Sequence, residues 1–277
     1  MYDGTCSMTT LPYDYPEMLG KLGIKAAMFA PLRPFVSTHY NYRDHRKIMV
    51  IDGKVAFTGG INLADEYINR KKRFGHWKDT AIMVRGQAVR NYTVMFLQLW
   101  EKADSDEIST LMPPENVSDK IPAIDGFIQP FSDSPLDTEP VGKRVYLELI
   151  SNARHYVCIT TPYLILDEEM TNALGFAAKK GVDVRIITPH IPDKWYVHMI
   201  AWNNYPALLE MGVEIYEYTP GFIHAKSLVA DGKTAVPSPE PTPVPTPVPS
   251  ADEEPAKNGH YHVPRSRNAF ALDPELR

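Results

Sequence analysis

The stretch His45-Arg46-Lys47-Ile48-Met49-Val50-Ile51-Asp52 decides the fold, and it fits the pattern H-x-K-x4-D. Its apolar, β-branched run at 48–51 predicts a strand, and Asp52-Gly53 predicts a tight turn into a second strand at 54–58. His45 and Lys47 are two positions apart, so in an extended chain they lie on one face and can hold an anion. A single copy of the pattern equally fits a hairpin with ordinary polar groups on its surface.

The pattern occurs a second time, in His224-Ala225-Lys226-Ser227-Leu228-Val229-Ala230-Asp231, and again precedes Gly-Lys. The segments upstream also match, because residues 19–24 resemble residues 208–213. Each of these segments ends a helix at a glycine and leads into a strand that a proline stops. We therefore interpret the chain as an internal repeat, and the second copy of the motif favours chemistry over an ordinary hairpin.

The remaining pattern predicts an α/β protein. In the second half, helices are predicted at 141–153, 168–180 and 194–211 and strands at 156–160, 182–188 and 213–218. Buried strands that alternate with helices in this way form parallel sheets. In the first half, helices are predicted at 16–22 and 87–103 and further strands at 24–29 and 80–85.

Two sets of side chains in the second half have both a structural and a functional interpretation. Polar side chains fall at the carboxyl ends of strands, where such sheets bind ligands: Thr160, Thr161, Tyr163 and His190. Large apolar side chains of the helix at 194–211 are expected in the core or an interface, with contact to a lipid acyl chain as the alternative: Trp195, Tyr196, Met199 and Trp202.

Composition shifts divide the chain into a first half at 1–104, a linker at 105–140, a second half at 141–236 and a tail at 237–277. The tail has prolines at every odd position from 237 to 249, which favours an extended, disordered chain over a strand. This tail occupies the place where the segment after the second motif should resemble the segment after the first. The first half has no room for the helices and strands that open the second half. We therefore expect both halves to be incomplete.

Composition also limits the possible partners. The 277 residues carry a net charge of −5, which argues against a nucleic-acid partner, and their hydrophobic content of 44% is typical of a globular protein. No apolar run approaches the ~18 residues of a membrane-spanning helix. The cysteines have no metal-ligand spacing, so we expect no metal and no cofactor. The basic residues 70–73 fit either a solvated loop or an attraction to anionic lipid headgroups.

Taken together, these motifs resemble the phospholipase D superfamily. The first motif continues into Gly59-Gly60-Ile61-Asn62, as it does in that superfamily. Longer stretches are similar to the bacterial cardiolipin synthases: residues 43–47, 58–67, 161–164 and 216–226. The resemblance implies an α/β fold of two repeated phospholipase D-like halves, with mixed β-sheets flanked by helices and the active site at the interface between the halves.

The resemblance also assigns roles to individual residues. The catalytic set comes from the two motifs: His45, Lys47, Asp52, His224, Lys226 and Asp231. The two aspartates of this set stand at turns, which favours an anchoring role. Asn62 and Gly60 are expected to contact the substrate phosphate. Asp79 occupies the place of a carboxylate that accepts a hydrogen bond from the imidazole of His45, which favours His45 as the nucleophile and His224 as the acid.

The implied activity is that of a phosphatidyltransferase, which makes cardiolipin and glycerol from two phosphatidylglycerol molecules through a phospho-histidine intermediate. Two alternatives stay open: a phosphodiesterase that uses water as the acceptor, and an inactive, truncated lipid-binding remnant. The implied partners are phosphatidylglycerol and an anionic membrane surface, at the cytoplasmic face of the bacterial cell membrane. The hydrophobic anchors that family members usually carry do not occur in this sequence, so we expect a peripheral or soluble chain.

Overall fold

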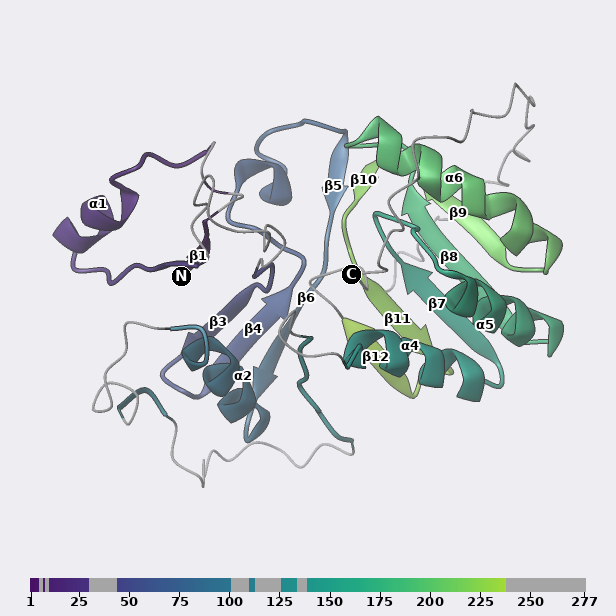
Figure 1. Cartoon of the computed structure of the whole chain (residues 1–277), viewed down its shortest axis with the longest axis horizontal. Coiled ribbons are helices and arrows are strands. Elements are labelled where there is room, and N and C mark those ends of the chain that lie inside the picture. The colour runs from purple at the N-terminus through teal and green to yellow at the C-terminus, as the bar shows by residue number, and fades with distance from the viewer. Residues whose placement is uncertain are drawn as a thin grey trace, which may run out of the picture.

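The computed structural model describes residues 1–4, 7, 10–29, 44–100, 110–112, 126–133 and 139–237. Two α/β units meet at a pair of strands, one strand from each unit (Figure 1). The predicted tail at 237–277 lies outside the described residues except for Pro237, which ends a strand, and most of the predicted linker also lies outside them. No helix in the described part of the chain is long and apolar enough to cross a membrane.

The second unit is built on a mixed five-stranded sheet in the order β12-β11-β7-β8-β9. Its strands are β7 (Tyr156–Thr160), β8 (Asp183–Pro189), β9 (Glu214–Tyr218), β11 (Ser227–Ala230) and β12 (Thr234–Pro237). Strands β7, β8 and β9 run parallel, whereas β11 is antiparallel to both β7 and β12. The sheet accommodates Pro237 because β12 is an edge strand, where a missing N–H costs little.

Three helices pack along this sheet: α4 (Val141–Asn152), α5 (Glu168–Lys179) and α6 (Trp195–Glu210). Their ends agree with the predicted ranges to within one residue. Helix α5 begins after Asp167, whose carboxylate accepts a hydrogen bond from the N–H of Met170 at 2.9 Å. Each helix buries its inner apolar face in one core, and full burial of a leucine or isoleucine there stabilises the fold by about 1.5–3 kcal/mol.

The first unit contains an antiparallel sheet in the order β3-β4-β6. Strands β3 (Ile48–Ile51) and β4 (Val55–Gly59) form the hairpin that the first motif predicts, and β6 (Ala81–Arg85) pairs with β4. Helix α2 (Ala88–Leu97) packs on this sheet. It is shorter than the range predicted for it, whose last residues lie outside the described part of the chain.

A parallel strand pair forms the N-terminal part of this unit: β1 (Tyr2–Asp3) and β2 (Met28–Phe29), with helix α1 (Tyr15–Lys21) between them. The strand predicted at 24–29 is therefore shorter than expected. The pair repeats the geometry of β8 and β9, because the N–H of Gly4 donates to Phe29 as the N–H of His190 donates to Tyr218. The strand pairs thus support the internal repeat.

The two units are joined by β5 (His76–Lys78) and β10 (Gly221–Ile223), which lie side by side in parallel (Figure 1). The sequence pattern predicts neither strand, because each is too short to show alternation. Gly221 allows the close approach, since a Cβ there would lie 2.3 Å from the backbone N and O of His76. The 3-10 helix η1 (Asp65–Ile68) lies beside β5. We call the β5–β10 pair the seam.

Candidate active site

The register of the seam brings Asp79 and His224 together, because each residue directly follows its strand. The N–H of His224 donates to the carbonyl of Lys78 at 2.7 Å, and the imidazole Nδ1–H donates to Asp79 Oδ2 at 2.7 Å. The two side chains are 145 positions apart in the chain. The predicted pairing of Asp79 with His45 was therefore wrong: its partner is His224, because the strand pairing crosses from one unit to the other.

The carboxylate of Asp79 is fixed through both oxygens. Oδ1 accepts the backbone N–H of Thr80 at 2.8 Å, Oδ2 accepts from His224, and the side chain is only 2% exposed. Gly60 packs directly against it, since a Cβ at Gly60 would lie 2.2 Å from Oδ1. The sequence predicts that Gly60 contacts the substrate phosphate. In the structure, this glycine makes room for the carboxylate that orients His224.

Lys226 completes a buried row of three side chains. Its Nζ lies 2.8 Å from Nε2 and 2.9 Å from Nδ1 of His224, and the residue is 2% exposed. The ionised carboxylate of Asp79 assigns the proton to Nδ1, which donates to it, so Nε2 is the ring nitrogen that can accept from Lys226. The approach of Nζ to Nδ1 at 2.9 Å is then a contact and not a hydrogen bond. Burial lowers the pKa of His224, Asp79 opposes this effect, and the positive charges of Lys226 and Lys47 add to it.

Aromatic rings surround the imidazole of His224. Tyr67 meets it edge-on at 5.4 Å between ring centroids, Trp77 lies at 5.4 Å and Phe222 at 5.9 Å. Asn62, the predicted phosphate-binding residue, donates through Nδ2 to the Tyr67 hydroxyl at 2.6 Å. Burial raises the pKa of Tyr67 to about 12, so this hydroxyl stays protonated near neutral pH. Asn62 thus lies one side chain away from His224.

Sequence reasoning missed the residues that hold this aromatic wall in place. Asn69 adopts a left-handed backbone, with φ of 58°. Its side chain accepts the N–H of Trp77 at 2.7 Å and donates to the carbonyl of Trp77 at 3.0 Å. The sequence signal for this contact is weak, because it consists only of the tolerance of asparagine for that conformation. Asn69 therefore fixes the loop after η1 to β5.

His45 and Lys47 belong to the same electrostatic centre. They lie in the segment just before β3, and both are half-buried. Burial, Lys47, Lys226 and His224 together lower the pKa of His45 to about 3, while the carboxylate of Asp3 opposes the shift. Charges of the second unit thus act on the first histidine, and Lys47 acts on His224 in return. The charged groups of the two motifs therefore lie close enough to influence one another across the seam.

The motif aspartates do not join this centre. Asp231 lies at the turn between β11 and β12, at the opposite end of β11 from Lys226. Its carboxylate accepts the backbone N–H groups of Arg154, His155 and Tyr156 at 2.8–2.9 Å, which lowers its pKa to about 2. Asp52 stands at the matching β3–β4 turn with a similar φ, 51° against 53°. The geometry of Asp231 is that of an anchor for the turn.

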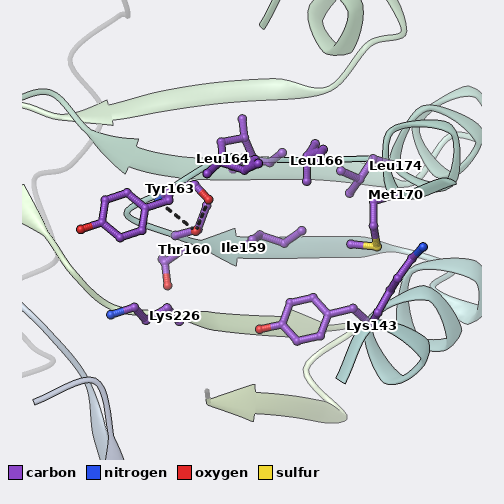
Figure 2. Close-up of a pocket in the computed structure, with 13 residues that line it drawn as sticks. Lys143, Ile159, Thr160, Tyr163, Leu164, Leu166, Met170, Leu174 and Lys226 are labelled. Carbon is purple, nitrogen blue, oxygen red and sulfur yellow. Dashed lines mark hydrogen bonds between the residues drawn. The ribbon is translucent and has the colours of Figure 1, made fainter. Parts of the chain in front are cut away.

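A small apolar cavity lies behind Lys226 (Figure 2). Lys226 and Tyr163 stand at one end and Lys143 and Met170 at the other, with aliphatic side chains between them. Its volume is about 50 Å³, which is room for only a few water-sized groups and not for a phospholipid headgroup. Lys226 therefore closes one end of a small, mainly apolar cavity.

The predicted polar residues at the strand ends make contacts of their own. Thr160 bonds Ser227 through their hydroxyls at 2.7 Å, and Tyr163 donates to the carboxylate of Asp193 at 2.6 Å. His190 pairs with Glu217 at 2.7 Å. In the described part of the chain, no three His, Cys, Asp or Glu side chains are grouped so that they could hold a metal ion.

The large apolar side chains of α6 do not lie in the core, one of the places predicted for them, and the predicted interface or acyl-chain contact stays open. Trp195, Tyr196, Met199 and Trp202 are 70%, 52%, 56% and 47% exposed. The helix packs on the sheet through its other face, which includes Ala201, Tyr205 and Leu208. Because both faces are apolar, helical periodicity could not distinguish the packed face from the exposed one.

Comparisons with known proteins agree with the motifs. Residues 146–238 match the family model described as the cardiolipin synthase, phospholipase D-like domain. An uncharacterized protein of Streptococcus mutans is 56% identical over 236 residues, which are 85% of this chain and 51% of that protein. A cardiolipin synthase of Halalkalibacterium halodurans is 39% identical over 238 residues, which are 85% of this chain and 46% of that protein.

Among solved structures, a phosphatidylserine synthase of Haemophilus influenzae is 14% identical and covers 78% of this chain and 58% of its own, with a TM-score of 0.49. The chain spans about half the length of the curated relatives described above. It is thus a relative of the bacterial cardiolipin synthases within the phospholipase D superfamily, as its paired motifs predicted.

Proposed function

We propose that this chain carries the active site of a phosphatidyltransferase that makes cardiolipin from two phosphatidylglycerol molecules. The observation that carries the proposal is the hydrogen bond between Asp79 and His224 in a buried centre, on which Lys226, Lys47 and His45 also act. The relatives that are named cardiolipin synthases support the substrate class. The lipid would be drawn from an anionic membrane, at its cytoplasmic face.

In the first step, His224 attacks the phosphorus of phosphatidylglycerol. Its Nδ1–H stays hydrogen-bonded to Asp79. The lone pair of Nε2 becomes available once the ammonium of Lys226 leaves it and pairs with a phosphate oxygen. A nitrogen–phosphorus bond forms while the bond from phosphorus to the headgroup glycerol oxygen breaks. Protonated His45 gives its proton to that oxygen, so glycerol leaves and the phosphatidyl group remains on His224.

His45 becomes an effective acid only when the substrate is bound. Burial and the neighbouring charges of Lys47, Lys226 and His224 lower its pKa to about 3, so its imidazole is neutral near pH 7. A bound phosphate places a negative charge beside Lys47 and Lys226, which offsets their effect and raises the pKa of His45. These roles reverse the prediction that His45 is the nucleophile, because the orienting carboxylate belongs to His224.

In the second step, a hydroxyl of another phosphatidylglycerol attacks the same phosphorus. His45, left neutral by the first step, removes the proton from this hydroxyl, and the nitrogen–phosphorus bond breaks. Cardiolipin leaves and His224 is restored. Lys47, Lys226 and Asn62 would stabilise the charge on the non-bridging oxygens in both steps.

The activity can be tested with labelled phosphatidylglycerol in mixed micelles. We expect cardiolipin, free glycerol and an acid-labile phospho-protein, all of which His224→Ala removes. Phosphatidic acid in place of cardiolipin would instead identify the hydrolase alternative. A folded chain that forms neither lipid and no phospho-protein would contradict the proposal and support the inactive alternative.

A second substrate separates the roles of the two histidines. A phosphatidyl ester of p-nitrophenol has a leaving group that departs without a proton, so it needs no general acid. We expect His45→Ala to release p-nitrophenolate and accumulate phospho-protein on this substrate, and His224→Ala to do neither. The reverse result would make His45 the nucleophile.

A further inference from the structure

Helix α6 presents an apolar face to solvent where most surface helices are polar. In its first two turns, Trp195, Tyr196, Met199 and Ile200 are 70%, 52%, 56% and 42% exposed. Further along the helix the outward positions are uncharged, and the first charged side chain is Glu210 at its end. An exposed apolar face of this kind indicates a surface that contacts a partner or a lipid bilayer.

A second exposed patch follows the first motif. Leu63 is 107% exposed and Ile68 is 57% exposed, on and beside η1. Four exposed cations follow directly, Arg70, Lys71, Lys72 and Arg73. Apolar side chains beside a row of cations match an anionic lipid surface. The apolar side chains can enter the boundary of the acyl chains, while the cations meet the anionic headgroups. This charge complementarity exists although the chain as a whole carries a net charge of −5.

The two patches flank the seam and adjoin the active site. Figure 1 shows the segment before β5 and the beginning of α6 at the same edge of the molecule, on either side of β5 and β10. Lys194 lies over the ring of Tyr163 at 5.4 Å, and Tyr163 donates to Asp193 just before the helix. From the other side, Tyr67 of η1 meets the imidazole of His224 at 5.4 Å. A bilayer at this edge would lie beside the reacting histidine.

We propose that these two patches form one docking surface for an anionic lipid bilayer. The inference rests on the proposed function, since it gives the site its route to a lipid substrate. The aromatic and aliphatic side chains of α6 and η1 enter the interface, where tryptophan and tyrosine are favoured. The cations at 70–73 hold the surface on anionic headgroups, and their contribution is screened by salt.

Co-sedimentation with vesicles tests the apolar half of this surface. The double variant Trp195→Ala, Tyr196→Ala should bind both phosphatidylglycerol-containing and pure phosphatidylcholine vesicles roughly tenfold more weakly than wild type, because it loses interfacial apolar area. The matched control is Phe176→Ala, which removes a 69% exposed aromatic side chain from α5 and should leave binding unchanged. Equal binding by wild type and the double variant would overturn the proposal.

The basic half of the docking surface is tested by the dependence of vesicle binding on lipid charge and salt. Replacing Arg70, Lys71, Lys72 and Arg73 by glutamine should weaken binding to anionic vesicles on the order of a hundredfold at low salt, and much less at high salt. Binding to neutral vesicles should not change. If the α6 variant altered self-association in sedimentation velocity but not vesicle binding, the face would contact a second copy and the proposal would be wrong.

Failure of the docking surface and failure of the proposed function give different results. The variant His224→Ala should bind vesicles as wild type does, because docking needs no catalysis. The α6 double variant should lose turnover on vesicles and keep it on a monomeric, short-chain phosphatidylglycerol. If vesicle binding depends on both patches while no lipid is turned over, the docking surface is supported and the phosphatidyltransferase is not.

Discussion

The two copies of the motif differ in how their histidines are held. His224 is 6% exposed, and its ring contacts Asp79 of the other unit on one side and Lys226 of its own motif on the other. His45 lies before β3, and burial together with the neighbouring lysines lowers its pKa to about 3. The carboxylate that opposes this shift belongs to Asp3. One sequence pattern therefore produces two unequal environments.

This inequality separates two chemical roles. A pair of titratable groups whose environments differ can divide the work of nucleophile and acid between them. The carboxylate at Asp79 fixes the tautomer of His224, and strand β5 carries that carboxylate across the seam. The first unit thus supplies the carboxylate that orients the histidine of the second unit. The comparison predicts that substitutions at the seam change the orientation and tautomer of His224 far more than those of His45.

The largest effect on this comparison is expected from Asp79→Asn. Asparagine can keep its oxygen on the N–H of Thr80 and present its NH2 group to Nδ1 of His224, so the tautomer is no longer fixed and the transfer rate should fall roughly 10²–10⁴-fold. The measurement is the initial rate of phosphatidyl transfer in mixed micelles. Asp183→Asn, which changes a 41% exposed carboxylate on β8, is the control and should keep the wild-type rate. A wild-type rate for Asp79→Asn would show that the bond is dispensable.

Gly60→Ala should produce the next largest effect. Its Cβ would meet Asp79 Oδ1 at 2.2 Å, so the carboxylate or the backbone must move, at a cost of about 1–3 kcal/mol in the free energy of unfolding. Gly20→Ala in helix α1 is the matched control, because no atom lies within 4 Å of its Cβ. Urea denaturation measures both variants. Equal midpoints for the two would mean that Gly60 does not support Asp79.

The pKa of His45 predicts a pH dependence of stability. The folded state keeps His45 neutral down to about pH 3, whereas the unfolded state binds a proton near its ordinary value of 6.5. The unfolded state therefore gains protons first, and stability falls as the pH drops below 6.5, by up to about 1.4 kcal/mol per pH unit for this group. Urea midpoints between pH 7.5 and pH 5 should decrease less in His45→Gln. An equal decrease would contradict the lowered pKa.

The turn aspartates should show the smallest difference between the two copies. Asp231 holds three backbone N–H groups, and its folded pKa of about 2 lies below its ordinary value of 3.8. Its contribution is therefore present above pH 4 and is lost as the pH falls toward 2. Asp231→Asn should lower the thermal midpoint at pH 7 more than Asp52→Asn does. The reverse order would make Asp52 the stronger anchor.

Much of the fold could be predicted from the sequence, because its signals are local. Helices α4 and α5 show a 3.6-residue period, and both motif hairpins show a short apolar run followed by Asp-Gly. The turn positions of Asp52 and Asp231 follow from the same pattern. Strands β5 and β10 could not be found in this way, because each has three residues and pairs only with a distant partner.

The candidate site was predictable in its residues but not in its pairing. His45, Lys47, His224 and Lys226 were selected from the paired motifs, and Asp79 was selected from the resemblance to the phospholipase D superfamily. The partner of Asp79 depends on a parallel register between segments 145 positions apart, which leaves no local trace. The exposed face of α6 was assigned to the core or an interface for a related reason, since hydrophobic residues on both faces carry no information about which face packs.

The most direct measurement is the tautomer and proton shift of each imidazole, followed by NMR on a chain labelled with ¹⁵N in histidine. In the wild-type chain, His224 should be a single Nδ1–H tautomer with a downfield proton. Asp79→Asn should abolish that proton signal and leave the resonances of His45 in place. If the substitution instead changed His45 and spared His224, the carboxylate would serve the first motif, and the proposed division of roles between the two histidines would be wrong.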